Sequence, residues 1–302
     1  MPGIFFEPSD RRSFLKTTIL AGAALAVDGC RSSVPHAVAS TRPERPLHLA
    51  LLSDTHVPGD RRTGSRGFNP WENLKRVVPE VVAVRPQAVI LNGDAARLEG
   101  LVPDYAEVRE LLQPVAAFAP VYMTLGNHDD RANFKKVFAA SGGKAANVKD
   151  KHILVIEEAA LRFVLLDSLL YTNKTAGLLG KVQREWLTEF LATNADKPIV
   201  IFVHHTLKDG DGDLLDARRL FEIIKPHRQV KAIFYGHSHE WSLAEREGVK
   251  LINLPAVGYN FADKEPVGWV DARFTSGGVD LTLRAFGGNT TDNLRIHQIR
   301  WA

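Results

Sequence analysis

Cysteine is almost absent from this chain of 302 residues, which contains only Cys30. A single cysteine cannot form a disulfide within the chain, so the fold does not depend on one. The apolar stretch near the amino terminus, residues 17–27, is shorter than the about 20 residues that span a bilayer. No block of lysine and arginine dominates, and the formal net charge is only +3. Composition therefore indicates neither a nucleic-acid nor a membrane-surface partner.

A calcium-binding loop of the EF-hand type is also missing. Residues 209–213 alternate aspartate with glycine, a pattern that suggests calcium. An EF-hand loop beginning at Asp209 needs glycine at its sixth position and glutamate at its twelfth. Leu214 and Leu220 stand at those two positions. We interpret residues 209–213 as a solvated loop at the rim of a pocket.

The amino terminus has the pattern of an export signal. Arg11 and Arg12 precede the sequence Ser-Phe-Leu-Lys, and the uncharged residues 17–27 follow. A basic segment followed by a short apolar segment is typical of secretory signal peptides. The paired arginines resemble a twin-arginine (Tat) signal, whose pattern has serine or threonine where Asp10 stands. We therefore expect residues 1–39 to be a twin-arginine signal peptide and lead-in, with the Tat export machinery as a partner.

Two cleavage sites remain open. Residues 27–30 resemble a lipoprotein box, which would make Cys30 a lipid anchor, although Asp28 departs from that pattern. The small residues Ala-Val-Ala at 37–39 offer a cleavage site for a soluble form instead. Either site predicts an exported protein, periplasmic or in the cell envelope, and the first makes it a lipoprotein.

Short apolar runs alternate with segments of helical periodicity along the rest of the chain. The runs with the length and composition of buried strands are 47–53, 88–91, 121–125, 198–203 and 230–234. The segments with apolar residues at helical spacing are 71–84, 105–118, 182–192 and 214–224. This alternation predicts parallel βαβ units. To these we add a hairpin of 153–156 with 162–166, and antiparallel strands at 249–254, 268–274 and 279–286.

Residues that bind divalent metals directly follow the five strand-like runs. These residues are Asp54 and His56, Asp94, Asn127 with His128 and Asp129, His204 with His205, and His237 with His239. Carboxylates, amide oxygens and imidazoles are ligands for hard or borderline cations. Because each cluster stands at the end of a strand, we expect one metal site at the edge of a sheet. No linker-like stretch separates the clusters, so we expect a single domain over residues 40–302.

The ordered set Asp-x-His, Gly-Asp, Gly-Asn-His-Asp, His-His and Gly-His-x-His resembles the calcineurin-like metallophosphoesterase superfamily. The resemblance covers about residues 47–260. It implies an α/β fold, a four-layer αββα sandwich of two mixed sheets with helices outside. It also implies two divalent metal ions (Mn, Fe, Zn or Co). Carried over motif by motif, one ion is held by Asp54, His56 and His239, the other by Asn127, His204 and His237, with Asp94 between them. Thr206 and Leu207 stand where the family often has two prolines, which leaves His205 as an alternative to His204.

The same resemblance implies the chemistry. Two divalent ions, two carboxylates and a bridging hydroxide leave about one net positive charge, which attracts a phosphate oxyanion. A hydroxide bridging the metals would attack the phosphorus of a small phosphate ester, a phosphodiester or phosphomonoester. His128 takes the place of the family histidine that protonates the leaving oxygen, with Asp129 as its orienting partner. The resemblance leans towards the bacterial phosphodiesterases of cyclic nucleotides or glycerophosphodiesters.

Two other functions compete with this hypothesis. A nuclease of the same superfamily would track a nucleic-acid backbone with clustered lysine and arginine, which the chain lacks. A non-catalytic metal-binding protein of the envelope would bind ions without hydrolysing esters. Residues that flank the clusters and are candidates to line the pocket are Arg97, Lys208, Trp241, Tyr259 and Asn260.

Overall fold

The computed structural model describes residues 45–138 and 144–301. The predicted signal peptide, both cleavage sites and Cys30 lie outside the described residues. Within the described part, none of the helices combines the length and the apolarity required to cross a membrane.

The first sheet has six strands in the order β13-β12-β11-β1-β2-β3. These strands are β1 (Leu47–Leu52), β2 (Ala88–Asn92), β3 (Val121–Thr124), β11 (Pro266–Thr275), β12 (Gly278–Gly288) and β13 (Ile296–Arg300). β1, β2 and β3 run parallel, and β11 joins the other side of β1 in the antiparallel direction. Every residue of β1 and β2 is buried, as their unbroken apolar runs predict.

The second sheet has seven strands in the order β4-β5-β6-β7-β8-β10-β9. These are β4 (Lys144–Ala145), β5 (Leu154–Glu157), β6 (Arg162–Leu165), β7 (Ile199–Phe202), β8 (Val230–Tyr235), β9 (Ser242–Arg246) and β10 (Val249–Asn253). β6, β7, β8 and β10 are parallel neighbours, and β5 and β9 flank them antiparallel. Both sheets are therefore mixed.

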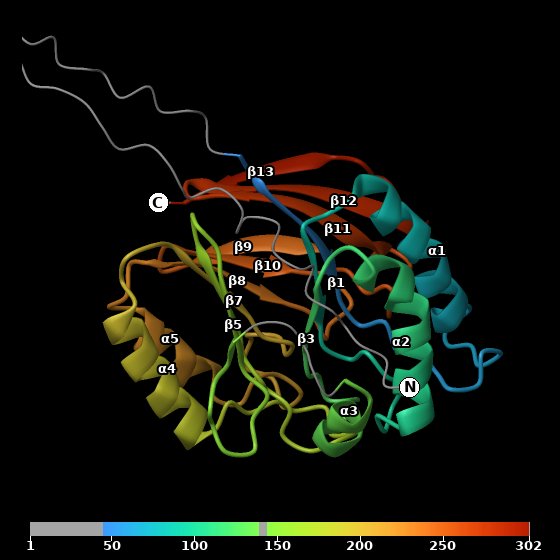
Figure 1. Ribbon diagram of the computed structural model, residues 1–302, viewed down its shortest axis with the longest axis horizontal. Helices are drawn as coiled ribbons and strands as arrows, with labels where there is room; N and C mark the ends of the chain where they lie inside the picture. Colours follow the sequence, from blue (N-terminus) through green and yellow to red (C-terminus); the bar gives the residue numbers. More distant parts are fainter. Residues whose placement is uncertain (1–44, 139–143, 302) are drawn as a thin grey trace, which may run out of the picture.

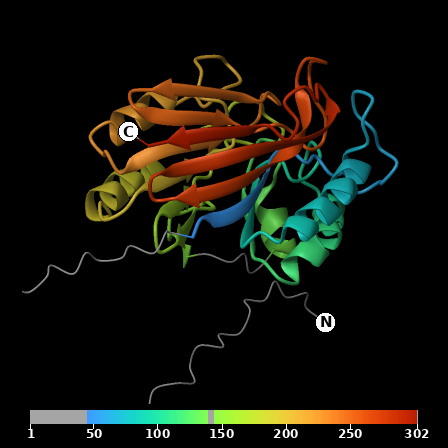
Figure 2. The same cartoon turned by 90° about the horizontal axis from the view of Figure 1, so that it is seen from above.

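In the described part of the chain, five helices cover the outer faces of the two sheets. Figures 1 and 2 show this arrangement. α1 (Pro70–Val84), α2 (Val102–Ala116) and α3 (Arg131–Val137) pack on the first sheet, and α4 (Lys181–Thr193) and α5 (Ala217–Ile224) on the second. A third apolar core fills the space between the sheets. The four-layer αββα sandwich is confirmed.

Local sequence explains where the first helix begins. The Asn69 side chain accepts a hydrogen bond from the Glu72 backbone N–H, and Pro70 occupies the first helical position. The buried side of α1 carries Leu74, Val77 and Val81, at the spacing that predicted this helix.

Several sequence expectations need correction. The strand expected at 249–254 was grouped with antiparallel strands, but β10 runs parallel to β8 and is antiparallel only to β9. β9 was missed because all five of its residues are exposed, so they show no buried alternation. α3, β4 and β13 were also missed. α2 begins at Val102 rather than at residue 105, and α5 at Ala217 rather than at residue 214.

Candidate metal centre

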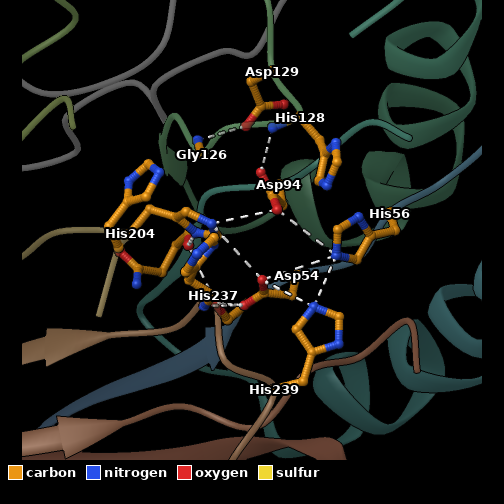
Figure 3. A network of polar contacts seen from close by, with 12 residues as sticks. Asp54, His56, Asp94, Gly126, His128, Asp129, His204, His237 and His239 are labelled. Carbon is orange, nitrogen blue, oxygen red and sulfur yellow. Dashed lines mark hydrogen bonds and ion pairs between the residues drawn. The ribbon is translucent and has the colours of Figure 1, made fainter. Parts of the chain in front are cut away.

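All five predicted clusters meet at one edge of the sandwich. The loops after β1, β2 and β3 of the first sheet carry Asp54 with His56, Asp94 and Asn127. The loops after β7 and β8 of the second sheet carry His204 and the pair His237 and His239. The carboxyl ends of parallel strands lie at the same edge of a sheet, so both sheets contribute to one site. Figure 3 shows Asp54 and Asp94 surrounded by the predicted ligands His56, His204, His237 and His239.

The first group of side chains combines Asp54, His56 and His239, whose ligand atoms lie within 4.8 Å of one another. His239 Nε2 is 3.3 Å from Asp54 Oδ1, and His56 Nε2 is 3.9 Å from the same oxygen. The Nε2 atoms of His56 and His239 are only 3.0 Å apart. Two imidazole lone pairs at this distance repel each other unless a proton or a cation lies between them.

The second group combines Asp94, His204 and His237, again with ligand atoms within 4.8 Å. His204 Nε2 is 3.3 Å from Asp94 Oδ2 and 3.8 Å from Asp54 Oδ1. His56 Nε2 is 3.8 Å from Asp94 Oδ2. Asp94 therefore faces a histidine from each group, and it lies where a shared ligand would be needed.

Backbone carbonyls orient three of the four histidines. The Nδ1 atom of His204 donates to the carbonyl of Asn92 at 2.8 Å, and Nδ1 of His239 donates to the carbonyl of Tyr259. The Nε2 atom of His237 donates to the carbonyl of Gly212 at 3.0 Å. A carbonyl accepts only, so each of these bonds places the ring hydrogen on one nitrogen and leaves the other nitrogen with a lone pair.

The backbone around the site adopts a conformation that non-glycine residues rarely use. Five of the predicted ligands have positive φ angles: Asp54 (52°), His56 (47°), Asp94 (48°), His237 (70°) and His239 (54°). Such angles cost free energy, and they cluster at functional sites because the surrounding structure holds them in place.

Two motif glycines are required by close approach. A Cβ atom at Gly126 would lie 2.2 Å from Asp94 Oδ1, and one at Gly236 would lie 2.5 Å from Asp54 Oδ2. Both distances are shorter than any real carbon–oxygen contact, so no side chain fits at either position without moving a carboxylate.

The two carboxylates dominate the electrostatics. Burial favours the protonated form of each, but the neighbouring histidines outweigh burial and lower the pKa of both Asp54 and Asp94. Burial lowers the pKa of His204 as well, yet Asp94 and Asp54 overcome it and raise that pKa to about 10. Burial lowers the pKa of His56 to about 3 and that of His237 to about 4. The site thus places two buried carboxylates among four imidazoles, a set of donor groups that suits a cation.

Unsatisfied polar atoms test whether metal ions fit these residues. Buried atoms with no hydrogen-bond partner in the described part of the chain include Asp54 Oδ1, Asn127 Oδ1 and His204 Nε2. Each carries a lone pair, and each belongs to a predicted ligand. Buried acceptors without a donor are costly. A divalent cation satisfies all three, so the residues present fit the expected metal ions.

His128 also brings a ligand-type atom within 4.8 Å of those of His56 and Asp94, but its ring is held differently. Its backbone N–H donates to Asp94 Oδ1 at 2.8 Å, and its ring lies 5.3 Å from the His56 ring. Its Nδ1 atom donates to the carbonyl of Leu98 at 2.9 Å, which leaves Nε2 as the free position of the ring. Leu98 itself has a positive φ of 47°.

Asp129 does not orient His128, and that expectation is corrected. Its carboxylate accepts from three backbone N–H groups of the loops after β2 and β3, at 2.8–3.4 Å, and from the hydroxyl of Tyr105 at 3.0 Å. The Leu98 carbonyl takes the ring hydrogen of His128 instead. Burial and the charge of Asp94 raise the pKa of Asp129 to about 6, while its hydrogen bonds act in the opposite direction. Asp129 ties two ligand-bearing loops together.

Of the two adjacent histidines, His204 faces the carboxylates and His205 does not join either ligand group. His205 Nδ1 lies 2.7 Å from the hydroxyl of Ser168, after β6. The ring of His205 packs 4.8 Å from the ring of His237. His205 therefore supports the second group from behind.

The aromatic residues beside His239 were only partly anticipated. Tyr259 was a candidate for the pocket lining, and its ring lies 4.9 Å from His56. Phe261, whose ring stacks on His239 at 4.2 Å, and Arg66, which lies over Phe261, were missed. No motif marks these two residues, and Arg66 stands almost 200 positions away from Phe261 in the chain.

Comparison with known proteins agrees with this geometry. The sequence profile described as calcineurin-like phosphoesterase matches residues 47–241. A probable cyclic nucleotide phosphodiesterase of Rhodococcus erythropolis (strain PR4 / NBRC 100887) is 30% identical over 225 residues, which are 71% of this chain and 72% of the relative. The glycerophosphodiester phosphodiesterase GpdQ of Enterobacter lignolyticus (strain SCF1) is 27% identical over 230 residues, 72% of this chain and 81% of the relative. A dimetal phosphatase from Danio rerio shares the fold with a TM-score of 0.67 at 14% identity, covering 86% of this chain and 100% of that one.

Proposed function

We propose that this chain, which belongs to the calcineurin-like phosphoesterase family and is a metal-dependent hydrolase of ester bonds, is an exported phosphodiesterase with two metal ions. The observation that carries the proposal is the convergence of ligand side chains from both sheets around Asp54 and Asp94, with unsatisfied lone pairs at the centre.

Each ion has its own half of the site in this proposal. The first half-site consists of Asp54, His56 and His239, and the second half-site of Asn127, His204 and His237. Asp94 lies between the half-sites and faces a histidine of each. When bound, two divalent ions of the Mn, Fe, Zn or Co type supply Lewis-acid polarisation of the phosphoryl oxygens and an activated water at neutral pH.

The protein's own residues supply position and a proton. The carbonyls of Asn92, Tyr259 and Gly212 fix the ring nitrogens that face the centre, so no rotation of these histidines is needed during the reaction. His128 has its Nδ1–H on a carbonyl, so its protonated ring carries a second proton at Nε2. We assign to that proton the protonation of the leaving oxygen.

The preference for diesters is supported by the names of the relatives, one a cyclic nucleotide and one a glycerophosphodiester phosphodiesterase. Export is supported by the Arg11-Arg12 signal alone. Replacing both arginines by lysine in the full chain is expected to retain the protein in the cytoplasm, as fractionation would show. Export of the double variant at the wild-type level would contradict a twin-arginine route.

Hydrolysis of bis(p-nitrophenyl) phosphate and of p-nitrophenyl phosphate by the purified Mn²⁺-loaded protein tests the activity. We expect the diester to be cleaved and the monoester to be cleaved much more slowly. Activity on the monoester alone would make the protein a phosphatase. A protein that holds metal and cleaves neither ester would support the non-catalytic envelope function.

A further inference from the structure

An aromatic surface with a cation lies directly beside the first half-site. The ring of Phe261 stacks on His239, with centroids 4.2 Å apart and planes at 21°, and it remains 50% exposed. The ring of Tyr259 lies 4.9 Å from His56 and 4.8 Å from His239. A substrate held at the half-site would meet these rings.

Arg66 completes this surface from the other end of the chain. Its guanidinium carbon lies 4.8 Å from the centroid of Phe261, and Arg66 forms no ion pair with any carboxylate of the described residues. Most charges in this loop are paired: Arg61 binds Glu107 and Glu110, and Arg62 binds Asp60. The charge of Arg66 is therefore not balanced by an ion-pair partner among the described residues, and it lies over the ring that stacks on His239.

Arg66 lies in a turn whose backbone conformation is unfavourable in free energy for arginine. Ser65 and Phe68 exchange backbone hydrogen bonds of 2.8 and 2.9 Å across it, and the two central residues, Arg66 and Gly67, have φ angles of 50° and 83°. Positive φ at both central residues is the type I′ pattern, which favours asparagine, aspartate or glycine at the place of Arg66. Because strained backbone conformations cluster at functional sites, this strain beside the metal centre indicates a function for the Arg66 side chain.

Resting on the function proposed above, we propose that Arg66, Tyr259 and Phe261 form a base-binding wall, and that the substrate is a phosphodiester bearing a nucleobase. Aromatic rings and arginine guanidinium planes are the side-chain surfaces on which bases stack. One ribose separates base and phosphate in a nucleotide, so a phosphate at the half-site brings its base to the wall. A glycerophosphodiester has no planar group that could stack on these rings.

The test compares two diesters on five Mn²⁺-loaded proteins: wild type, Phe261→Leu, Phe261→Trp, Arg66→Gln and Arg85→Gln. Adenosine 3′,5′-cyclic monophosphate carries a base, and glycerophosphoethanolamine carries none. Arg85 is a matched control, because it also has a φ of 50° and lies 4.6 Å from a phenylalanine ring, Phe118. It follows α1 and precedes β2, so it lies at the opposite edge of the sheet from the metal centre.

We expect KM for the cyclic nucleotide to rise about tenfold in Phe261→Leu and about fivefold in Arg66→Gln, the range of one lost stacking contact. The ratio of kcat/KM between cyclic nucleotide and glycerophosphoethanolamine should fall by the same factors, and Arg85→Gln should leave it at the wild-type value. Phe261→Trp should restore the ratio. An unchanged ratio in both wall variants would overturn the proposal.

A binding measurement separates this proposal from the function on which it rests. Metal-loaded wild type is expected to bind adenosine 5′-monophosphate about tenfold more tightly than glycerol 3-phosphate, and Phe261→Leu should remove the difference. This result would uphold the wall even if no diester were cleaved, in which case the proposed activity would be wrong. Equal binding of the two monoesters by wild type would overturn the wall, whatever the hydrolysis assays show.

Discussion

The first and second half-sites share Asp94, but they are supported by different means. In the second half-site, His204 and His237 each donate a ring hydrogen to a backbone carbonyl. In the first half-site only His239 is held in this way, and His56 is positioned by packing against the rings of His128, His239 and Tyr259. Main-chain hydrogen bonds define one half-site, and side-chain packing defines much of the other.

The two half-sites also differ in the electrostatic surroundings of their histidines. His204 lies 3.3 Å from Asp94, and the carboxylates raise its pKa to about 10, whereas His56 lies 3.8 Å from Asp94 and burial lowers its pKa to about 3. In the second half-site this raised pKa is confined to His204, because burial lowers the pKa of His237 to about 4. The first half-site is bordered by His128 and the base-binding wall, the groups to which we assign substrate contact. We infer that the second half-site anchors the metal centre and that the first half-site faces the substrate.

Removing the residue common to both halves should have the largest effect. Asp94→Ala deletes the carboxylate that faces both half-sites, so we expect both ions to bind weakly and diester hydrolysis to fall about a thousandfold or more, equivalent to several kcal/mol. Metal content by elemental analysis and kcat/KM measure the two effects. Two ions per chain in this variant would contradict a shared ligand.

Replacing one ligand in each half-site shows how much each half-site contributes to metal binding. We expect His56→Ala and His204→Ala each to retain about one ion per chain and to lose hydrolysis by roughly a hundredfold to a thousandfold, because both ions are needed for the displacement. Elemental analysis after dialysis against a limited excess of Mn²⁺ makes the comparison. If His56→Ala lost both ions, the second half-site could not be the independent anchor.

His128→Ala should affect the reaction rather than the metal. We expect two ions to remain and kcat to fall about a hundredfold to a thousandfold, as for the loss of a general acid. The loss should be greater for an alkyl leaving group than for p-nitrophenolate, which departs without a proton. An equal loss for both leaving groups would contradict proton donation by His128.

The smallest effects should come from the supporting serines. The Ser53 hydroxyl donates to Asp54 Oδ2, and Ser168 lies 2.7 Å from His205 behind the second half-site. Because a hydrogen-bonded ligand typically loses about tenfold or more in metal affinity without its partner, we expect that loss in Ser53→Ala. Ser168→Ala, which touches no ligand, should change affinity by less than about threefold. Titration with a metal-sensitive dye compares the variants, and the reverse order would contradict the assignment of His204.

The strand-end clusters could be predicted from sequence because each one directly follows a buried apolar run. A run with the length and composition of β1 or β7 favours an interior strand, and its last residue marks where the next polar group stands. The order of motifs then implied the two-sheet fold. The exposed edge strand β9 gave no such pattern, and the pairing of β10 with β8 depends on the whole sheet.

The wrong role for Asp129 has a similar cause. Adjacency in sequence suggested a partner for His128, but the loop donors after β2 and β3 lie closer in space and need an acceptor. The contact between Arg66 and Phe261 could not be predicted from the sequence for the same reason. The turn and the loop that carry these residues are almost 200 positions apart and meet only in the folded chain.

In the proposed centre, side chains from two sheets hold two ions on either side of Asp94. The most direct test is a crystal of the mature protein loaded with Mn²⁺, with anomalous scattering recorded at the manganese edge. Two peaks per chain are predicted, one bounded by Asp54, His56 and His239 and one by Asn127, His204 and His237, with Asp94 between them. A single peak, or peaks away from these residues, would contradict the account.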